Sequence, residues 1–493
     1  MLNLAPIWGV DIGDTAIKAV KLKRVGKQVA MLDFHVVAYE QLSGEPGARR
    51  EGMAAEALQA LQAAGMGRDK CYISIAPQAV FSRFISLPPV DKRRIPEIVL
   101  YEARQQIPFN LNEVIWQYQT VRQEFQLGEE IEIGLFAVKR EVVESYLAEL
   151  WPIAKQIQGI QVGPLALHNF VTHSLSLDRP TVVLDIGAQS TDLLIIDGPK
   201  FWLRNLPIAG NSFTSALEKR LNIPRSEAEK LKRGIAESRH RRKLLEVLRP
   251  VMRDLVAEVQ RSIGYYKSLS QEAKFEDIIV LGDGFKLFGL DRFLADQLQY
   301  RIDTVEQLEN LPWQGPGPRE DELRANIPTL GPAVGLALQG LGEGRDEINL
   351  LPDDVVIKRE LHAKRATSLV AVALIWAMIG ALWVQEGREL QALQGMANLG
   401  GDTLERVQEK AGVLRDAENQ RDTARADRFE ELGAHREYYA RIIGALSRQM
   451  PDVIIEGGFR FVTPDDLVGE GGVGMGRYGM EEDLYGGDMG LYG

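Results

Sequence analysis

The sequence predicts a large α/β domain followed by a single hydrophobic span, and two observations lead to this prediction. The phrases GVDIGDTAIK and VLDIGAQSTD repeat one arrangement of strand, tight turn and strand, in a region where strand-like and helix-like stretches alternate. Much later, residues 366–384 contain no charged side chain. A chain of 493 residues is too long for one hydrophobic core, so at least two structured units are expected.

The composition argues against several classes of function. A net charge of -11 disfavours a nucleic-acid binder, since such proteins present a dominant Lys/Arg face to the phosphates. Cys71 is the only cysteine, which excludes an intramolecular disulfide and disfavours a cysteine-based zinc site. The histidines are scattered, and the nearest pair, His168 and His173, lacks the spacing of a helical metal site. From the net charge we expect no nucleic-acid partner.

The first half of the predicted domain opens with an antiparallel meander of β-branched stretches over residues 7–42. Residues 50–67 have helical spacing, residues 71–88 return to strands, and residues 91–109 again predict a helix. A second arrangement of strand, Asp-Ile-Gly turn and strand follows at residues 179–198. The opening theme therefore recurs.

The second half is expected to be mostly helical over residues 212–275. Residues 275–298 then predict a strand, a glycine turn and a helix. After a Pro/Gly-rich loop at residues 311–321, the stretch LGPAVGLALQGL closes the domain near Gly344.

The two Asp-Ile-Gly hairpins have the chemistry of an anion site. Such a turn points backbone N–H groups at an anion, and Gly13 and Gly187 allow phosphate oxygens to approach closely. Asp11 and Asp185 would face each other across a cleft, where two carboxylates can hold a hydrated Mg²⁺ ion between them.

Two further features complete a nucleotide site. The stretch IVLGDGFKLFGL places a glycine turn, Gly282 to Gly284, after a buried strand, and such a turn could pack against an adenine ring. The helix SEAEKLKRG places Glu229 and Lys232 on one face at i,i+3, able to reach a ribose and a base edge. Taken alone, that pair is typical of an exposed salt bridge.

Together these motifs resemble the phosphate-1, phosphate-2 and adenosine motifs of the actin/Hsp70 ATPase superfamily, which includes FtsA. Within it, residues 1–343 resemble the PilM family of type IV pilus assembly, through phrases such as RFISLPPVDKRRIPEIVLYEARQQIPF and RNLPIAGNSFTSAL. The resemblance implies two related subdomains around a nucleotide cleft, with an inserted FtsA/PilM-like small subdomain at about residues 80–165.

The resemblance also implies which residues bind ATP and Mg²⁺. The cofactor-binding residues would be Asp11, Gly13, Thr15, Lys18, Asp185, Gly187, Ser190, Thr191, Gly210, Asn211, Glu229, Lys232, Gly282, Gly284 and Phe285. Lys18 would supply positive charge to the phosphates, and Asp11 and Asp185 would hold Mg²⁺ through water.

Two residues depart from the family pattern. Asp14 stands where the family usually has Ser, and Asp283 stands where a second glycine is usual. A carboxylate close to phosphate is repulsive unless a cation intervenes. The sequence also offers no unambiguous group to activate an attacking water, so we assign no catalytic residue and expect ATP binding with at most slow hydrolysis.

The segment EINLLPDDVVIKRE, residues 347–360, resembles the start of the PilN family, the membrane partner of PilM. The resemblance implies that a peptide from this segment lies extended in a groove of the PilM-like domain. Its residues are Ile348, Asn349, Leu350, Leu351 and Pro352. Because few residues separate Leu341 from Ile348, we expect docking onto a neighbouring molecule, and hence self-association through this peptide.

Residues 366–384 are long enough, at about 1.5 Å per residue, to cross a bilayer core of roughly 30 Å as a transmembrane helix. Basic residues precede the span, so the positive-inside rule places the amino-terminal domain in the cytoplasm. The start MLNLAPIWGVDIGD lacks the basic region of a signal peptide. We expect a single-pass protein of the bacterial inner membrane with a periplasmic carboxyl terminus.

The remaining segments are assigned by composition and spacing. Residues 344–365 would be the peptide and a basic linker. Residues 385–465 predict a helical PilN-like periplasmic region, in which coiled-coil spacing between Leu404 and Leu414 leaves a coiled coil and a solvated helix both open. Residues 466–493 are Gly-rich and predict disorder.

The predicted function is an ATP-binding inner-membrane platform for type IV pilus assembly, combining PilM-like and PilN-like roles, whose nucleotide state controls partner contacts. Expected partners are PilN- and PilO-like membrane proteins and a cytoplasmic assembly motor. Alternatives are a single-span component of a type II secretion system, against which the INLLP peptide counts, a sugar-kinase-like phosphotransferase, and a filament-forming protein like FtsA.

Overall fold

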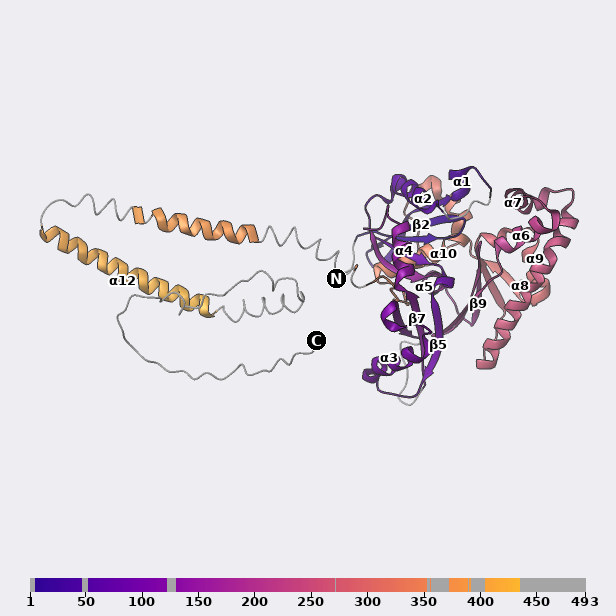
Figure 1. Ribbon diagram of the computed structural model, residues 1–493, viewed down its shortest axis with the longest axis horizontal. Helices are drawn as coiled ribbons and strands as arrows, with labels where there is room; N and C mark the ends of the chain where they lie inside the picture. Colours follow the sequence, from indigo (N-terminus) through magenta and orange to yellow (C-terminus); the bar gives the residue numbers. More distant parts are fainter. Residues whose placement is uncertain are drawn as a thin grey trace. The chain divides into compact units, whose positions relative to one another are not determined.

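The structure, a computed structural model, describes residues 5–46, 52–121, 130–270, 272–352, 355, 372–388, 390, 391 and 404–434. The chain divides into two compact units, Met1–Ala371 and Val372–Gly493. Figure 1 shows both, with labels on several of their helices and strands.

The first sheet of the larger unit has the strand order β3-β2-β1-β4-β8. Its strands are β1 (Ile7–Ile12), β2 (Ala16–Val25), β3 (Gln28–Ala38), β4 (Cys71–Ile75) and β8 (Ile157–Val162). The first three strands pair antiparallel, and β4 and β8 join in parallel. The predicted opening meander is therefore confirmed.

The second sheet repeats this topology with the order β11-β10-β9-β12-β13. Its strands are β9 (Thr181–Ile186), β10 (Thr191–Asp197), β11 (Lys200–Leu206), β12 (Asp277–Leu281) and β13 (Arg301–Thr304). Again a meander, β9 to β11, is followed by strands that pair in parallel. The repeated motif in the sequence is thus part of a repeated sheet.

A smaller antiparallel sheet lies between β4 and β8 in the sequence, with the order β5-β7-β6. It is formed by β5 (Phe81–Leu87), β6 (Val114–Thr120) and β7 (Ile131–Lys139). Helix α3 (Ile95–Gln106) buries Ile95, Val99 and Ala103 in a separate hydrophobic cluster with these strands. Figure 1 shows α3 beside β5 and β7.

The helices complete the two halves. Those packed with the first sheet are α1 (Tyr39–Ser43), α2 (Ala54–Leu61), α4 (Arg140–Glu149), α5 (Gly163–Ser174) and α10 (Glu320–Leu341), with a π-helical turn at Gln62–Met66. Those of the second half are α6 (Gly210–Leu221), α7 (Arg225–Arg233), α8 (Arg241–Leu269) and α9 (Leu290–Leu298). Short 3-10 turns lie at Pro77–Ala79, Lys92–Arg94, Leu111–Glu113, Ile235–Glu237, Asp283–Lys286 and Gly317–Arg319.

Helix α10 is the central element of the first half. From Thr329 to Gln339 its residues are buried all round, because the helix packs against α5 and against strands of the first sheet. Close packing requires Gly335, since a Cβ atom there would overlap the backbone carbonyl of Ala166 in α5. Helix α10 therefore joins α5 rigidly to the sheet.

In the smaller unit, residues 372–388 are helical and α12 spans Leu404–Ala434. The side chains of residues 372–388 are exposed, and Arg425 of α12 pairs with Glu386 at 2.5 Å. Within the described part of the chain, no helix is both long and apolar enough to cross a membrane.

Several predicted segments fall outside the residues that the structure describes. These are residues 366–371 of the predicted span, most of the basic linker at 356–365, residues 435–465 and the Gly-rich tail at 466–493.

Candidate functional site

The predicted nucleotide cleft is a cavity of about 380 Å³ between the two halves of the larger unit. Its volume falls in the range of small-molecule sites. The lining residues are Thr15, Ala16, Val36, Ala38, Glu40, Gly187, Ala188, Gly210, Asn211, Phe213, Glu229, Lys232, Arg233, Asp283, Gly284, Lys286 and Leu287. They come from the β1–β2 and β9–β10 turns, β3, α1, α6, α7 and the turn after β12.

The two Asp-Ile-Gly turns have matching backbone geometry. The Gly13 N–H donates to the Ala16 carbonyl at 3.1 Å, and the Gly187 N–H donates to the Ser190 carbonyl at 3.0 Å. Both turns face the cavity, the first through Thr15 and the second through Gly187. Two equivalent loops thus border one cavity.

Lys18, on β2, lies at the centre of the charges near the cleft. Its Nζ atom pairs with Asp283 at 3.4 Å. Burial lowers the pKa of the Lys18 ammonium, but the carboxylates of Asp283, Asp11 and Asp185 outweigh burial, so the pKa is raised overall. The site keeps this lysine charged.

The buried carboxylates beside the cleft have unequal surroundings. Asp11 accepts a hydrogen bond from the Ser74 hydroxyl at 2.7 Å. Burial raises the pKa of Asp185 to about 6; Lys18 opposes this rise and Asp11 adds to it. Burial likewise raises the pKa of Asp192 to about 7, against a hydrogen bond from Asn205. Crowded carboxylates of this kind are typical of functional sites.

Among the described residues, no cluster of three or more His, Cys, Asp or Glu side chains is placed to hold a metal ion directly. Asp11 and Asp185 remain a pair of carboxylates beside one cleft, which is the donor chemistry that Mg²⁺ takes through water.

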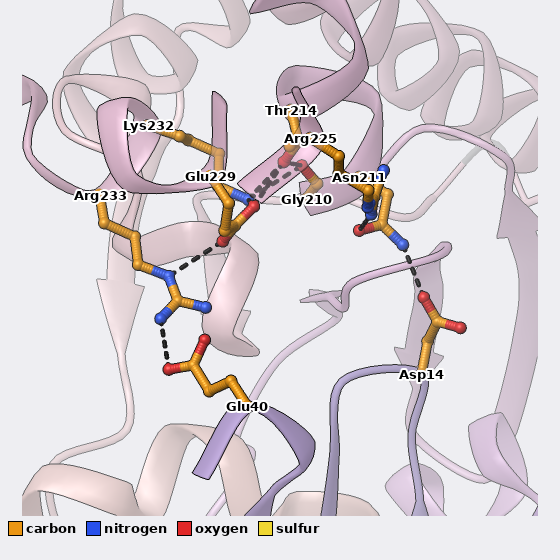
Figure 2. A network of polar contacts seen from close by, with 9 residues as sticks. All are labelled: Asp14, Glu40, Gly210, Asn211, Thr214, Arg225, Glu229, Lys232 and Arg233. Atoms are coloured by element: carbon orange, nitrogen blue, oxygen red, sulfur yellow. Dashed lines mark hydrogen bonds and ion pairs between the residues drawn. The ribbon is translucent and has the colours of Figure 1, made fainter. Parts of the chain in front are cut away.

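The amino-terminal end of α6 closes on the second turn. The Gly210 N–H donates to the Gly187 carbonyl at 3.0 Å, and the Asn211 N–H donates to the Ala188 carbonyl at 2.7 Å. The Asn211 side-chain amide donates to Asp14 at 2.7 Å, and its oxygen accepts from Arg225 at 2.5 Å. Figure 2 shows Asn211 between these two partners.

The predicted pair Glu229 and Lys232 forms an ion pair at 2.7 Å. Glu229 is only 6% exposed, and its carboxylate also accepts from Thr214 and from Arg233. The Lys232 ammonium donates to the Gly210 carbonyl at 3.2 Å and to the Thr214 hydroxyl at 2.9 Å. The pair lines the cavity and also joins α7 to α6.

Three polar contacts between described residues cross the cleft. Asn211 donates to Asp14, Lys18 pairs with Asp283, and Arg233 pairs with Glu40 at 2.7 Å. Figure 2 draws the first and the third of these contacts. The first two use the residues that depart from the family pattern. In this structure both departures therefore link the two halves across the cleft.

The turn after β12 approaches the second hairpin closely. Gly282 has a φ of 87°, and a Cβ atom there would overlap the Ile186 carbonyl and the Asp185 side chain, so only glycine fits. Gly284 lines the cavity, whereas Phe285 packs against the hydrophobic core of the second half. Asp283 lies between Lys18 and Lys286.

The structure therefore brings a subset of the predicted residues to the cavity wall. These are Thr15, Gly187, Gly210, Asn211, Glu229, Lys232 and Gly284. Asp11, Gly13, Lys18, Asp185, Ser190, Thr191, Gly282 and Phe285 are not among the lining residues. Thr191 is buried and its hydroxyl donates to the Ile208 carbonyl at 2.6 Å, so it stabilises the hairpin.

Glu40 and Arg233 line the cavity but were not predicted. Arg233 follows Lys232 directly, so its place at the end of a basic helix was a usable signal. Glu40 gave no comparable signal, because its partner lies 193 positions away.

The INLLP peptide occupies a second candidate site, the surface between the edge strands β8 and β6, which we call the linker groove. The Leu350 N–H donates to the Ile160 carbonyl at 2.7 Å, and the Asn349 side chain accepts from the Ile160 N–H at 2.9 Å. On the other side, the Asn349 N–H donates to the Gln117 side chain at 2.7 Å. The peptide thus adds to a sheet edge.

The apolar peptide residues fill the groove as expected, since Ile348, Leu350 and Leu351 are at most 3% exposed. In this structure the peptide lies in the groove of its own chain, whereas docking onto a neighbouring molecule was expected. Helix α10 ends beside the groove, and Gln339 in its last turn already donates to the Ile348 carbonyl at 2.8 Å. The short connection between α10 and the peptide is therefore long enough for the peptide to reach the groove of the same chain.

The family model described as type IV pilus assembly protein PilM matches residues 9–341. The chain is similar to the solved PilM-PilN type IV pilus biogenesis complex, with 27% sequence identity, covering 69% of this chain and 99% of that chain, at a TM-score of 0.58.

Two further solved structures are more distant. One is the cytoplasmic domain of EpsL, an inner membrane component of the type II secretion system of Vibrio cholerae, with 10% identity, covering 71% of this chain and 98% of that chain, at a TM-score of 0.33. The other is MreB5 of Spiroplasma citri bound to AMPPNP, with 14% identity, covering 66% of this chain and 98% of that chain, at a TM-score of 0.35. Neither similarity bears on function at these TM-scores.

Proposed function

This chain belongs to the PilM family of type IV pilus assembly proteins and has the predicted actin-like ATPase fold, and we propose from that premise that it is an ATP-binding platform at the bacterial inner membrane. The observation that carries the proposal is the pair of matching Asp-Ile-Gly turns around one cavity, with the charged Lys18 beside them.

Within this proposal, the two turns bind the phosphates. Thr15 and Gly187 present the two turns to the cavity in which the phosphates would lie, and Lys18 supplies positive charge once it exchanges Asp283 for the nucleotide. Asp11 and Asp185 hold Mg²⁺ through water, and that ion offsets the charge of the triphosphate. Gly284, Glu229 and Lys232 border the adenosine.

We propose that ATP turns over slowly at most. The carboxylates that line the cavity are engaged: Glu40 pairs with Arg233, Glu229 pairs with Lys232, and Asp283 keeps its pair with Lys286 when Lys18 turns to the nucleotide. A carboxylate held in an ion pair is a poor general base, because the pair lowers its affinity for a proton.

Helix α10 connects the cleft to the linker groove, which supports control of partner contacts by the nucleotide. The Pro328 carbonyl of α10 accepts from the Gly282 N–H at 2.8 Å, and Gln339 of the same helix holds Ile348. A shift of the glycine turn on ATP binding would move one end of a rigid element.

Hydrogen exchange tests whether nucleotide binding in the cleft affects the peptide in the linker groove. We expect ATP to change the exchange rates of residues 346–351, since their backbone is held through α10. Identical rates with and without ATP, at saturating nucleotide, would refute nucleotide control while leaving ATP binding intact.

We propose that residues 344–384 serve as a fused PilN-like segment, with residues 366–384 crossing the membrane and residues 385–465 in the periplasm. The run without charges, the exposed apolar side chains such as Leu374 and Trp376, and the preceding basic linker support a span. PilN- and PilO-like proteins and a cytoplasmic motor are the proposed partners. Release of the full chain from membranes by alkaline carbonate would contradict the span.

Titration with a fluorescent ATP analogue tests nucleotide binding on the full chain in detergent. We expect saturable, Mg²⁺-dependent binding, weakened about tenfold or more by Lys18→Ala through loss of a charge-assisted contact. Lys21→Ala is the matched control, because Lys21 lies on the same strand and pairs with Asp69 at 2.7 Å, away from the cavity lining. A folded chain that binds no nucleotide would overturn the proposal.

A further inference from the structure

Asp346, in the connection between α10 and the INLLP peptide, is almost completely buried, with 2% exposure. Its neighbours Arg345 and Glu347 are exposed. A buried carboxylate in a charged surface connection is unusual, since an ionised group leaves water only where it is paired and hydrogen-bonded.

The side chain of Asp346 is held at both oxygens. One oxygen accepts a hydrogen bond from the Gln119 side chain on β6. The other lies 2.6 Å from Nδ1 of His168 on α5. The His168 ring in turn stacks on Phe201 of β11, with the ring centroids 4.3 Å apart.

The backbone of Asp346 is also recognised. Its N–H donates to the Asn169 side-chain oxygen at 2.7 Å, and its carbonyl accepts from the Asn169 amide at 3.0 Å. The Gln161 amide donates to the same carbonyl at 2.8 Å. Asn169 therefore hydrogen-bonds to both backbone groups of one residue, as a neighbouring β-strand would.

The residues around Asp346 form a pocket of polar side chains, most of them buried. Gln161 and Asn169 are 0% exposed and His168 is 3% exposed. Buried polar side chains need hydrogen-bond partners, because an unpaired one loses its contacts with water and gains none from the protein. We call Gln119, Gln161, His168 and Asn169 the aspartate pocket; nothing in nucleotide binding uses it.

We propose that the aspartate pocket is a specificity site of the linker groove, which selects peptides that carry Asp two residues before the Ile of Ile-Asn-Leu-Leu-Pro. The apolar part of the groove accepts Ile348, Leu350 and Leu351, which are all positions of the Ile-Asn-Leu-Leu-Pro core motif. The pocket adds a second requirement. It thereby favours the chain's own linker over a separate peptide that has the core motif without the aspartate.

Charge and geometry both support selection of an aspartate. Gln119 and His168 reach the carboxylate from β6 and α5, which lie on different sides of the connection. An alanine at this position would keep the contacts from Gln161 and Asn169 to the backbone but leave the Gln119 amide and His168 without their acceptor. An apolar residue is therefore penalised, beyond the loss of its own contacts.

Hydrogen exchange on the full chain in detergent tests the pocket directly. We expect Asp346→Ala to raise the exchange rates of residues 346–351 by about tenfold, the ratio that follows from losing a charge-assisted hydrogen bond of about 1.4 kcal/mol. Glu347→Ala is the matched control, since this neighbouring carboxylate is exposed, and we expect no change. Equal protection in Asp346→Ala and wild type would overturn the proposal.

A peptide series provides a second test, which does not depend on the folding of Asp346→Ala. In the receptor, the full chain with Leu350→Asp, the buried apolar contact of the linker is disrupted and the groove is open. Labelled peptides with the sequence of residues 344–352 are compared with versions that have alanine in place of Asp346 or of Glu347. We expect the first replacement to weaken binding about tenfold and the second to leave it unchanged. Equal affinities for all three peptides would refute selection by the pocket.

Discussion

The nucleotide cleft and the linker groove both contact α10, the cleft at Pro328 and the groove at Gln339, but their polar groups are arranged differently. In the groove, the buried carboxylate of Asp346 has a donor at each oxygen. Beside the cleft, burial raises the pKa of Asp185 to about 6 and that of Asp192, its cross-strand neighbour, to about 7.

This difference separates a site that is already filled from one that is poised for a ligand. A buried carboxylate with a hydrogen-bond partner at each oxygen stabilises the fold as it stands. Carboxylates with raised pKa values are under electrostatic tension, which a cation relieves. We therefore expect substitutions in the groove to change stability and substitutions in the cleft to change binding and pH dependence.

The largest effect should come from Gly335→Ala, which acts on both regions through α10. The new Cβ atom would overlap the Ala166 backbone, so α10 would separate from α5. We expect a loss above about 4 kcal/mol, enough to prevent folding of the larger unit, measured by urea denaturation. Gly264→Ala is the control, because a Cβ atom there meets no other atom within 4 Å. A wild-type transition in Gly335→Ala would contradict the central role of α10.

Leu350→Ala should affect the groove alone. Leu350 is 0% exposed, and removing its side chain leaves a cavity that costs about 2–3 kcal/mol. Because the peptide lies at the end of the domain, we expect it to undock locally, with fast exchange of residues 346–351, while ATP binding persists. Leu100→Ala is a control at a position with 39% exposure. If ATP binding is lost together with the docked peptide, the two regions are not separable.

Asp192→Asn should change the pH dependence of folding stability, because burial disfavours the ionised form of this carboxylate beside the cleft. The folded pKa of Asp192, about 7, lies above its ordinary value, so the folded state holds the proton more tightly. The stability from this group is full at low pH and is lost as pH rises towards 7. Because this loss spans the interval between the ordinary pKa of an Asp and about 7, we expect the stability advantage of Asp192→Asn over wild type, measured by urea denaturation, to be about 2 kcal/mol larger at pH 8 than at pH 5.

The control for this pH experiment is Asp178→Asn, at an exposed position. Asp178→Asn should show the same difference in folding stability between pH 5 and pH 8 as the wild type. The explanation fails if Asp192→Asn has the same effect at both pH values.

The smallest effect is expected for Asp283→Asn. This change removes a negative charge next to Lys18 and frees the lysine for phosphate. We expect ATP affinity to rise about three- to tenfold, which corresponds to about 1 kcal/mol for a partly exposed charge. Asp291→Asn, in the first turn of α9, is the control. Weaker ATP binding by Asp283→Asn would instead assign Asp283 to the nucleotide site itself.

Much of the local structure followed from the sequence because short-range chemistry decides it. The turns at Gly13 and Gly187 need a small residue between two strands, and the sequence shows this pattern twice. The ion pair of Glu229 and Lys232 follows from spacing on one helix. The apolar block Ile348–Leu351 also announced a buried contact within a polar connection.

The contacts that cross the molecule did not follow from the sequence. Asp14 and Asn211 are 197 positions apart, and only the approach of the two halves makes them partners. Asp346 resembles any solvated acidic residue of a linker until α5 and β6 are seen on either side of it.

The repeated hairpins, the helical periods and the hydrophobic peptide can be read from the sequence alone, because each depends on neighbours within a few residues. The tertiary structure decided that the peptide docks on its own chain and that the aspartate before it is buried. Those outcomes depend on where α10 ends relative to β8, a distance set by the packing of the whole core. The linker is therefore part of the folded domain.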